Sequence, residues 1–416
     1  MNREQYLNML INSKDNGKIK VLTGTTGSGK TYLLKTLYKE YLVNQGIEKD
    51  YIIHIDFEKK KYSHIKSSAE VISLLSEIIN KQNKYYIFLD EILTIEDYED
   101  LLEELLELEN IDVYIAVSNT KFITSKLRIR IGNELNEIFV MPLSFKEFRM
   151  AYSEITDDID VFEKYMEYGG MPGLLEIHKD KDKEKYLTQL IDGKIIPDII
   201  KQYTIYHENV FIELTNLLAK YFGKSSTPFK MVEMMRKDKD KLSDKTLRTY
   251  LDYLIDSFLI NEVYFYDVKK KKEIKRSVNH FYYDVGLLCV KKQFENINND
   301  MKIKTIIHSE LVSRGFDVYY GRFEIFSKDS DGKTLRKFDN IVFVIKDSVT
   351  NRHYYIELAS DTDVSINEAE KKYSYIRDSF KKFILVREQI NPQWTEKGVV
   401  IMSVTDFLLN KDSLDM

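Results

Sequence analysis

The residues with the clearest chemistry lie near the N-terminus, in a glycine-rich stretch that ends in Lys-Thr. The stretch fits the pattern G-x-x-x-x-G-K-[ST] at every fixed position. Glycines allow the backbone to turn so that its N–H groups point inward, and such a nest at a helix N-terminus binds phosphate. We therefore expect an ATP·Mg²⁺ site, in which Lys30 reaches the β- and γ-phosphates and the Thr31 hydroxyl ligates Mg²⁺. The predicted binding residues are Gly24, Thr25, Thr26, Gly27, Ser28, Gly29, Lys30 and Thr31.

A pair of acidic residues follows the apolar run Tyr85–Leu89. Asp90 is expected to emerge at the carboxyl end of a buried strand, which is where open α/β sheets bind their ligands. There its carboxylate would hold Mg²⁺, and Glu91 would act as the general base that activates the attacking water. An isolated Asp-Glu pair means little, but its position after a phosphate loop makes this assignment specific.

The elements that must position these groups show in the hydrophobic pattern of the first 150 residues. Short runs rich in Ile, Val, Tyr and Phe alternate with helical patterns, which is typical of buried parallel strands joined by helices. The expected helix after the phosphate loop spans Tyr32–Leu42. We predict an α/β fold whose core has a parallel five-stranded sheet. The expected strands are Ile19–Thr23, Tyr51–Asp56, Tyr85–Asp90, Asp112–Ser118 and Glu137–Met141.

Composition limits the class of protein. The 62 basic and 67 acidic side chains among 416 residues give a net charge of −5, which excludes a strongly basic chromatin-type protein. The single cysteine, Cys289, excludes a disulfide scaffold and a cysteine-ligated zinc site, and it favours a reducing compartment. There is no apolar leader and no apolar run near the roughly 18 residues of a membrane span. We expect a cytoplasmic protein without a membrane partner.

One strand separates the phosphate loop from Asp90-Glu91, and this arrangement resembles the AAA-type ATPases. The resemblance implies that a polar residue after the next strand positions the attacking water. Asn119 is the candidate for this residue, and Ser118 is the alternative. It also implies a homo-oligomeric ring in which a neighbour supplies an arginine. Arg128 and Arg130 lie in the right region, although a surface ion pair with Glu134 or Glu137 is the simpler interpretation.

Four later segments resemble a more specific prokaryotic family of AAA-like ATPases with a large C-terminal domain of unknown function. They are Met141–Phe148 (M-P-L-S-F-K-E-F), Tyr168–Pro172 (Y-G-G-M-P), Lys245–Leu254 and His280–Gly286. The resemblance implies an AAA-like core at 1–150, a helical lid or connector at 151–223, a winged helix at 224–290 and a restriction-endonuclease-like α/β domain at 291–416. Members of that family often have Gly-Arg at the position where this chain has Gly132-Asn133. Because this chain lacks the arginine, a role for it here is in doubt.

The last domain has most of a metal-dependent nuclease pattern but lacks one part. Glu310, Asp339 and Glu357 follow the expected order of carboxylates, yet Ala359 stands where a lysine is needed. Without that cation, the charge of the transition state is poorly stabilised. Lys337 and Lys371 are possible substitutes. We therefore expect an inactive relic of a nuclease.

The winged-helix segment 224–280 has 14 basic and 9 acidic residues, a net charge of +5. A helix near Pro228–Arg236 precedes a second helix capped by Ser243 or Asp244, which carries Lys245 and Arg248 at its start. The Lys269–Lys272 run forms the expected wing tip. This polarity suits contacts with the phosphates of double-stranded DNA, while packing with a solvated lysine turn is an equal alternative.

Together these features predict an ATP-hydrolysing AAA-like ATPase that works as a conformational switch and acts on DNA in genome defence or a mobile element. Two alternatives remain open. One is a non-enzymatic, nucleotide-gated adaptor that binds a partner through its C-terminal half. The other is an ATP-controlled DNA nuclease.

Overall fold

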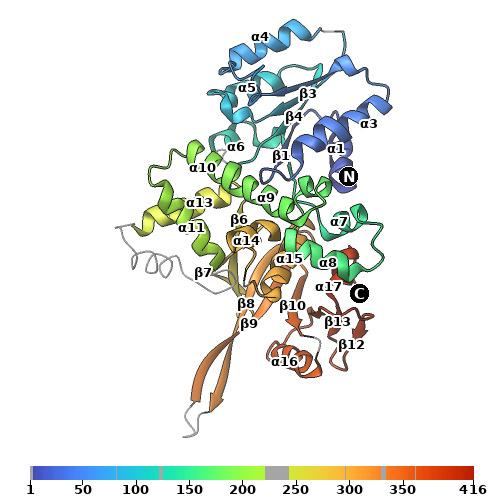
Figure 1. Ribbon diagram of the computed structural model, residues 1–416, viewed down its shortest axis with the longest axis vertical. Coiled ribbons are helices and arrows are strands. Elements are labelled where there is room, and N and C mark those ends of the chain that lie inside the picture. The colour runs from blue at the N-terminus through green and yellow to red at the C-terminus, as the bar shows by residue number, and fades with distance from the viewer. Residues whose placement is uncertain are drawn as a thin grey trace. The chain divides into compact units, whose positions relative to one another are not determined.

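The structure is a computed structural model with two compact units (Figure 1). One unit comprises residues 1–142 with 256–258, and the other comprises residues 143–255 with 259–416. The described residues are 3–80, 82–120, 125–220, 243–295, 297–328, 334–360 and 362–416. Among them, none of the helices has the length and hydropathy that a membrane span needs.

The first unit is built on a parallel five-stranded sheet with the strand order β2-β3-β4-β1-β5. The predicted parallel five-stranded α/β core is thus confirmed. The sheet brings β4 between β1 and β3, so the chain segments that follow these three strands meet at one edge. The strands are β1 (Ile19–Thr23), β2 (Ile52–Asp56), β3 (Tyr85–Asp90), β4 (Ile111–Ala116) and β5 (Leu135–Phe139).

Helices cover both faces of this sheet, which is why its central strands are buried throughout. Alternate residues of β3 face opposite cores: Ile87 packs with α4, α5 and α6, whereas Phe88 packs with α1 and the helix after the phosphate loop. That helix continues through α2, a π-helical stretch η1 and α3. The bounds are α1 (Glu4–Ser13), α2 (Lys30–Tyr32), η1 (Leu33–Tyr38), α3 (Lys39–Asn44), α4 (Ser68–Ile78), α5 (Tyr98–Leu106) and α6 (Ser125–Ile131).

The second unit begins with a run of helices, where the sequence analysis expects a helical lid or connector at 151–223. It starts before residue 150, because Phe145 and Phe148 of its first helix pack in its own hydrophobic core. A later helix, α13, has Ser243 at its N-terminus, where the Ser243 hydroxyl accepts a hydrogen bond from the Thr246 amide at 3.1 Å. The helices are α7 (Phe145–Ala151), α8 (Asp158–Tyr168), η6 (Pro172–Glu176), α9 (Asp180–Leu190), η7 (Ile191–Ile195), α10 (Ile196–Gln202), α11 (Glu208–Lys220) and α13 (Asp244–Asp256).

A mixed eight-stranded sheet forms the rest of this unit, in the order β12-β13-β11-β10-β9-β8-β6-β7. The strands are β6 (Ile260–Asp267), β7 (Lys272–Tyr282), β8 (Asp317–Lys328), β9 (Thr334–Lys346), β10 (His353–Ala359), β11 (Lys381–Val386), β12 (Gln393–Trp394) and β13 (Val400–Ser403). The accompanying helices are α14 (Val285–Lys291), α15 (Asn299–Ser313), α16 (Asp363–Tyr373) and α17 (Val404–Leu409).

This sheet crosses the domain boundary expected at residue 290. The wing hairpin β6–β7 joins the C-terminal strands, because Phe265–Asp267 pairs in parallel with Tyr320–Arg322 of β8. The expected winged helix and terminal domain therefore share one sheet. The helix expected near Pro228–Arg236 lies outside the described residues, so the winged helix itself stays a prediction.

The strand β8 extends as far as Lys328, because it pairs with β9 along most of its length. The helix α16 ends at Tyr373, because tight turns follow it: the amides of Tyr375 and Ile376 bond to carbonyls three residues back.

The motif segments after residue 140 converge on the side chain of Asp284. Its carboxylate caps α14 by accepting the Leu287 amide at 3.1 Å, and it accepts the Gly170 amide at 2.7 Å. Gly170 in turn accepts a hydrogen bond from the Leu143 amide, and a Cβ at Gly170 would overlap the Leu143 carbonyl oxygen. Burial raises the pKa of the Asp284 carboxyl from 3.8 to about 6. This network explains why the P-L-S-F and G-G-M-P segments occur together.

The serine of the same motif starts a helix. Ser144 and Glu147 form a capping box at α7, in which each side chain accepts the backbone N–H of the other residue. Such a box satisfies two amides that would otherwise lack partners at the start of the helix. The S-F-x-E part of the motif is therefore structural.

Candidate nucleotide-binding site

The loop after β1 has the backbone that a phosphate nest requires. Gly24, Gly27 and Gly29 all have positive φ angles, of 141°, 87° and 97°. A Cβ at Gly24 would overlap the carbonyl oxygen of Val140, so a larger residue does not fit there. Gly29 immediately precedes α2, so the loop opens directly into the N-terminus of a helix.

The Lys30 side chain is folded back over this loop. Its ammonium group donates to the carbonyl oxygens of Gly24 at 2.7 Å and Thr25 at 3.0 Å. The side chain is buried, at 5% exposure. The Lys30 ammonium therefore lies against the loop that is expected to bind the phosphates. Thr31, at the start of the helix, is exposed.

Several polar atoms of the loop and of the end of β3 are buried without a hydrogen-bond partner among the described residues. They include the Thr25 hydroxyl, the Ser28 hydroxyl and Oδ1 of Asp90. Buried polar atoms are normally satisfied, so a group of such atoms indicates a missing ligand. A carboxylate oxygen and the Thr31 hydroxyl are oxygen ligands of the kind that Mg²⁺ prefers, and the residues present therefore fit a metal–nucleotide complex.

Asp90 ends β3 and is held by a histidine that the sequence did not single out. Oδ2 of Asp90 lies 2.9 Å from Nε2 of His54, which comes from the neighbouring strand β2. This contact fixes one carboxylate oxygen and leaves the other available. No local pattern could reveal it, because the two residues meet only through the pairing of β2 with β3.

Glu91 directly follows the strand in a left-handed conformation, with φ 53°. This conformation is unfavourable for a residue with a side chain, and it is frequent at functional sites. The Ser118 hydroxyl donates to Oε1 of Glu91 at 3.0 Å. Burial raises the pKa of the Glu91 carboxyl, while the Lys30 ammonium and the Ser118 hydroxyl oppose that rise. A raised pKa makes the carboxylate a better proton acceptor.

Ser118 and Asn119 follow β4, between the phosphate loop and Asp90-Glu91 in the order of the sheet. Asn119 is buried, at 3% exposure. Ser118, the alternative to Asn119, is the residue that contacts Glu91. Positioning of the water by Asn119 stays a prediction.

Residues 16–149 match the family model of an AAA domain. The N-terminal part of this chain is an AAA domain. Residues 159–298 match a domain of unknown function, DUF8612. The sequence prediction of an AAA-like core followed by a C-terminal domain of unknown function is confirmed.

The chain is also similar to two relatives and to a solved structure. The chain is 29% identical to an uncharacterized protein of Haemophilus influenzae, over 98% of both chains. It is 23% identical to an uncharacterized protein of Methanocaldococcus jannaschii, over 76% of this chain and 70% of that one. Its fold resembles a Walker-type ATPase of Pyrococcus abyssi, with a TM-score of 0.50 and 13% identity, covering 70% of this chain and 95% of that structure.

The two arginines considered for a neighbour's site are both paired within this AAA domain. Arg128 forms an ion pair with Glu137 at 3.2 Å, one of the two surface partners that the sequence suggested. Arg130 contacts Asp100 at 3.0 Å and also pairs with Glu103, both on the acidic helix α5. These pairs favour the simpler, surface role for both arginines.

The carboxylates of the expected nuclease site have separate surroundings in the second unit. Glu310 on α15 forms an ion pair with Arg314 at 2.7 Å. Glu357 on β10 is buried, and Lys372 of α16 lies 3.2 Å from its Oε1. The lysine beside this carboxylate is thus Lys372, rather than the expected Lys337 or Lys371.

Asp339 and Glu357 share one neighbour. Both raise the pKa of the Tyr320 hydroxyl, which reaches about 12 chiefly through burial. Among the described residues, no three His, Cys, Asp or Glu side chains form a group that could hold a metal ion. The nuclease-like site is therefore incomplete as a three-carboxylate metal centre.

The cations assigned to the winged helix are partly engaged. Arg248 pairs with Glu262 of β6 at 2.6 Å and with Asp252 at 2.9 Å. Lys269 donates to the Glu324 carbonyl oxygen at 2.6 Å, whereas Lys245 is exposed. The second helix of the expected winged helix, α13, thus has the exposed cation of Lys245 at its start.

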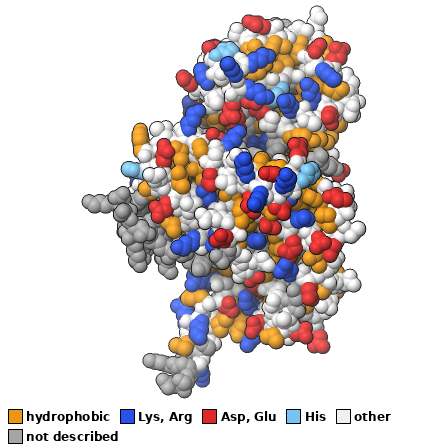
Figure 2. Space-filling model, viewed as in Figure 1, with side chains coloured by type: hydrophobic (Ala, Val, Ile, Leu, Met, Phe, Trp, Pro, Cys, Tyr) orange, Lys and Arg blue, Asp and Glu red, His pale blue; other side chains and the backbone are white. Residues whose placement is uncertain are grey.

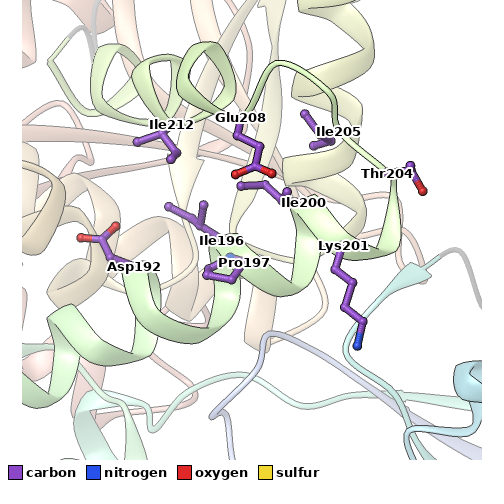
Figure 3. Close-up of a pocket in the computed structure, with 9 residues that line it drawn as sticks. All are labelled: Asp192, Ile196, Pro197, Ile200, Lys201, Thr204, Ile205, Glu208 and Ile212. Carbon is purple, nitrogen blue, oxygen red and sulfur yellow. The ribbon is translucent and has the colours of Figure 1, made fainter.

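A separate pocket of about 520 Å³ lies in the second unit, beside η7, α10 and α11. Figure 3 shows the Glu208 carboxylate pointing toward Ile200, with the Lys201 ammonium pointing away. The lining residues are Asp192, Ile196, Pro197, Ile200, Lys201, Thr204, Ile205, Glu208 and Ile212. None of them belongs to a predicted site.

Proposed function

We propose that the AAA domain binds ATP with Mg²⁺ and hydrolyses it, and that the cycle switches the conformation of the chain. The observation that carries the proposal is the set of unpartnered buried oxygens in the loop that holds the Lys30 ammonium and at the end of β3. An enzyme that binds a phosphate chain must replace its water with fixed protein dipoles and charges. The loop, Lys30 and Asp90 supply donors, a cation and an anion in one place.

Each residue then has a defined task. The N–H groups of the loop and Lys30 bind the phosphates. Thr31 and Asp90 would hold Mg²⁺, which when bound would offset the charge on the phosphates. Glu91 accepts the proton of the attacking water, and Ser118 orients the Glu91 carboxylate for that task. His54 orients Asp90 through Oδ2, which leaves Oδ1 for a metal ion.

Calorimetric titration of the full chain with ATP and Mg²⁺ tests nucleotide binding. Lys30→Ala should weaken ATP binding by about 100-fold, because several charge-assisted hydrogen bonds to phosphate are lost. Lys35→Ala is the matched control, since Lys35 is an exposed lysine on the same helix. Equal affinity in the wild type and Lys30→Ala would refute the site.

The adaptor alternative has a distinct signature. The pairing of Arg128 and Arg130 within the chain supports it, because those arginines would otherwise be candidates to assist hydrolysis in a neighbour. Tight ATP binding without any steady turnover would favour the adaptor over the ATPase.

A further inference from the structure

The strands β8 and β9 continue beyond the rest of their sheet as a two-stranded arm, defined here as residues 322–328 and 334–340 (Figure 1). β6 pairs with β8 only as far as Arg322, and the pairing of β10 with β9 covers Phe343–Lys346. Beyond Arg322 the two strands of the arm pair only with each other, among the described residues. None of the expected functional assignments uses this arm as an interface.

The register separates the two faces of the arm. Glu324 pairs with Phe338, Phe326 with Arg336 and Lys328 with Thr334, so these residues share one face. The opposite face contains Phe323, which is buried and stacks on Tyr375. The opposite face therefore packs on its own unit at Phe323, whereas the face with Phe326 and Phe338 is open.

The open face is basic and aromatic. We call Arg322, Phe326, Lys328, Arg336 and Phe338 the basic–aromatic face. Arg322 lies 4.1 Å from the ring centre of Phe338, and Arg336 lies 5.2 Å from the same ring. Phe326 and Phe338 are 61% and 48% exposed. Figure 2 shows basic and hydrophobic side chains together along this arm.

The charge of this face points to a polyanion. Its three cations are opposed on the same face by the single carboxylate of Glu324, which pairs with Arg336. The lysine-rich turn after β6 adds positive charge beside this face. The Val268 amide donates to the Arg322 carbonyl oxygen at 3.0 Å, and the Lys269 ammonium donates to the Glu324 carbonyl oxygen. A chain with a net charge of −5 thus concentrates positive charge beside exposed aromatic rings.

We propose that the basic–aromatic face binds double-stranded DNA, with the arm lying in a groove of the duplex. A two-stranded ribbon has the width that the major groove admits, and its Arg and Lys side chains then reach the phosphates on either side. Phe326, at the most exposed part of the face, contacts the bases or sugars, as apolar side chains do in architectural DNA-binding proteins. The five residues of this face lie outside the segment 224–280, and the proposal does not depend on ATP hydrolysis.

Fluorescence anisotropy of a short labelled duplex, titrated with the full chain over a series of salt concentrations, tests the proposal. Replacing both Lys328 and Arg336 with Ala should flatten the log–log salt dependence by about two units, since each lost phosphate contact removes about 0.9. Phe326→Ala should weaken binding about 10-fold while leaving that slope unchanged. The matched controls are Lys185→Ala and Tyr206→Ala, at exposed positions of the same unit, and both should bind as the wild type does.

Three outcomes would overturn the proposal: no duplex binding by the wild type at low salt, equal binding by the arm variants, or binding of single strands alone. ATP hydrolysis without DNA is measured for the same variants and should be unchanged. A wild-type chain that binds DNA through the arm but has no turnover would refute the proposed ATPase and leave the interface standing.

Discussion

Two buried aspartates, Asp90 of the AAA domain and Asp284 of the second unit, show how the same side chain serves different ends. Asp90 is the last residue of β3, Asp284 lies two residues after the end of β7, and both are at most 3% exposed. Asp284 accepts backbone N–H groups on both oxygens, from Gly170 and Leu287. Asp90 has His54 on one oxygen and no hydrogen-bond partner on the other among the described residues. A satisfied carboxylate holds a fold together, whereas a half-satisfied one is ready for a ligand.

The largest effect on stability is expected at Asp284. Asp284→Ala should lower the free energy of unfolding by about 3 kcal/mol, because buried N–H groups lose their acceptor. Asp90→Ala should change it by less than about 1 kcal/mol, since the lost contact is a single one. Urea denaturation followed by circular dichroism measures both. A larger loss at Asp90 than at Asp284 would reverse the comparison.

The pH dependence of stability provides a second readout of the same variant. The pKa of Asp284 is raised from 3.8 to about 6 in the folded chain, so the folded state binds the proton more tightly. The protonated Asp284 carboxyl therefore stabilises the folded chain fully below pH 4, and this stabilisation decreases as the pH rises to about 6. Asp284→Ala should remove this decrease.

A smaller effect is expected at Ser118. Its hydroxyl lowers the pKa of Glu91, so Ser118→Ala should raise that pKa further. The acid limb of kcat/KM for ATP should then move to higher pH, by less than about one unit. A pH–rate profile of the two proteins measures it. A limb that moves to lower pH would show that Ser118 does not act through the Glu91 carboxylate.

No measurable effect is expected from the nuclease-like residues. We expect no cleavage of plasmid DNA with Mg²⁺ or Mn²⁺, because Ala359 supplies no cation and Lys372 is already paired with Glu357. Agarose gels of plasmid incubated with the wild type test this. Metal-dependent nicking that Asp339→Ala abolishes would restore the nuclease alternative and give Lys372 the role of the missing lysine.

The sequence predicted most of the AAA domain, because its signals are local. The bounds of β1 and β3 agree with the expected Ile19–Thr23 and Tyr85–Asp90, since strands buried on both faces appear as continuous apolar runs. The phosphate loop is equally local, because backbone N–H groups and one lysine within eight residues make it. His54 was missed because its contact with Asp90 exists only through strand pairing.

The second unit was less predictable because its contacts join distant segments. The arm was missed, since exposed polar residues such as Lys328 and Arg336 give no alternating apolar pattern. The lysine beside Glu357, Lys372, was not among the possible substitutes named from the sequence, because the register of α16 against β10 decides which lysine reaches it. The motif segments around Asp284 were recognised as a family resemblance, but their shared hydrogen bonds required coordinates.

The most direct test of the account is the rate of ATP hydrolysis by Glu91→Gln compared with the wild type, with ATP binding measured on both proteins. Gln keeps the size and hydrogen-bonding capacity of the side chain but cannot accept the proton of the attacking water. The account predicts ATP affinity close to that of the wild type and turnover at least about 100-fold slower. Wild-type turnover in Glu91→Gln would contradict the assignment of Glu91 as the general base.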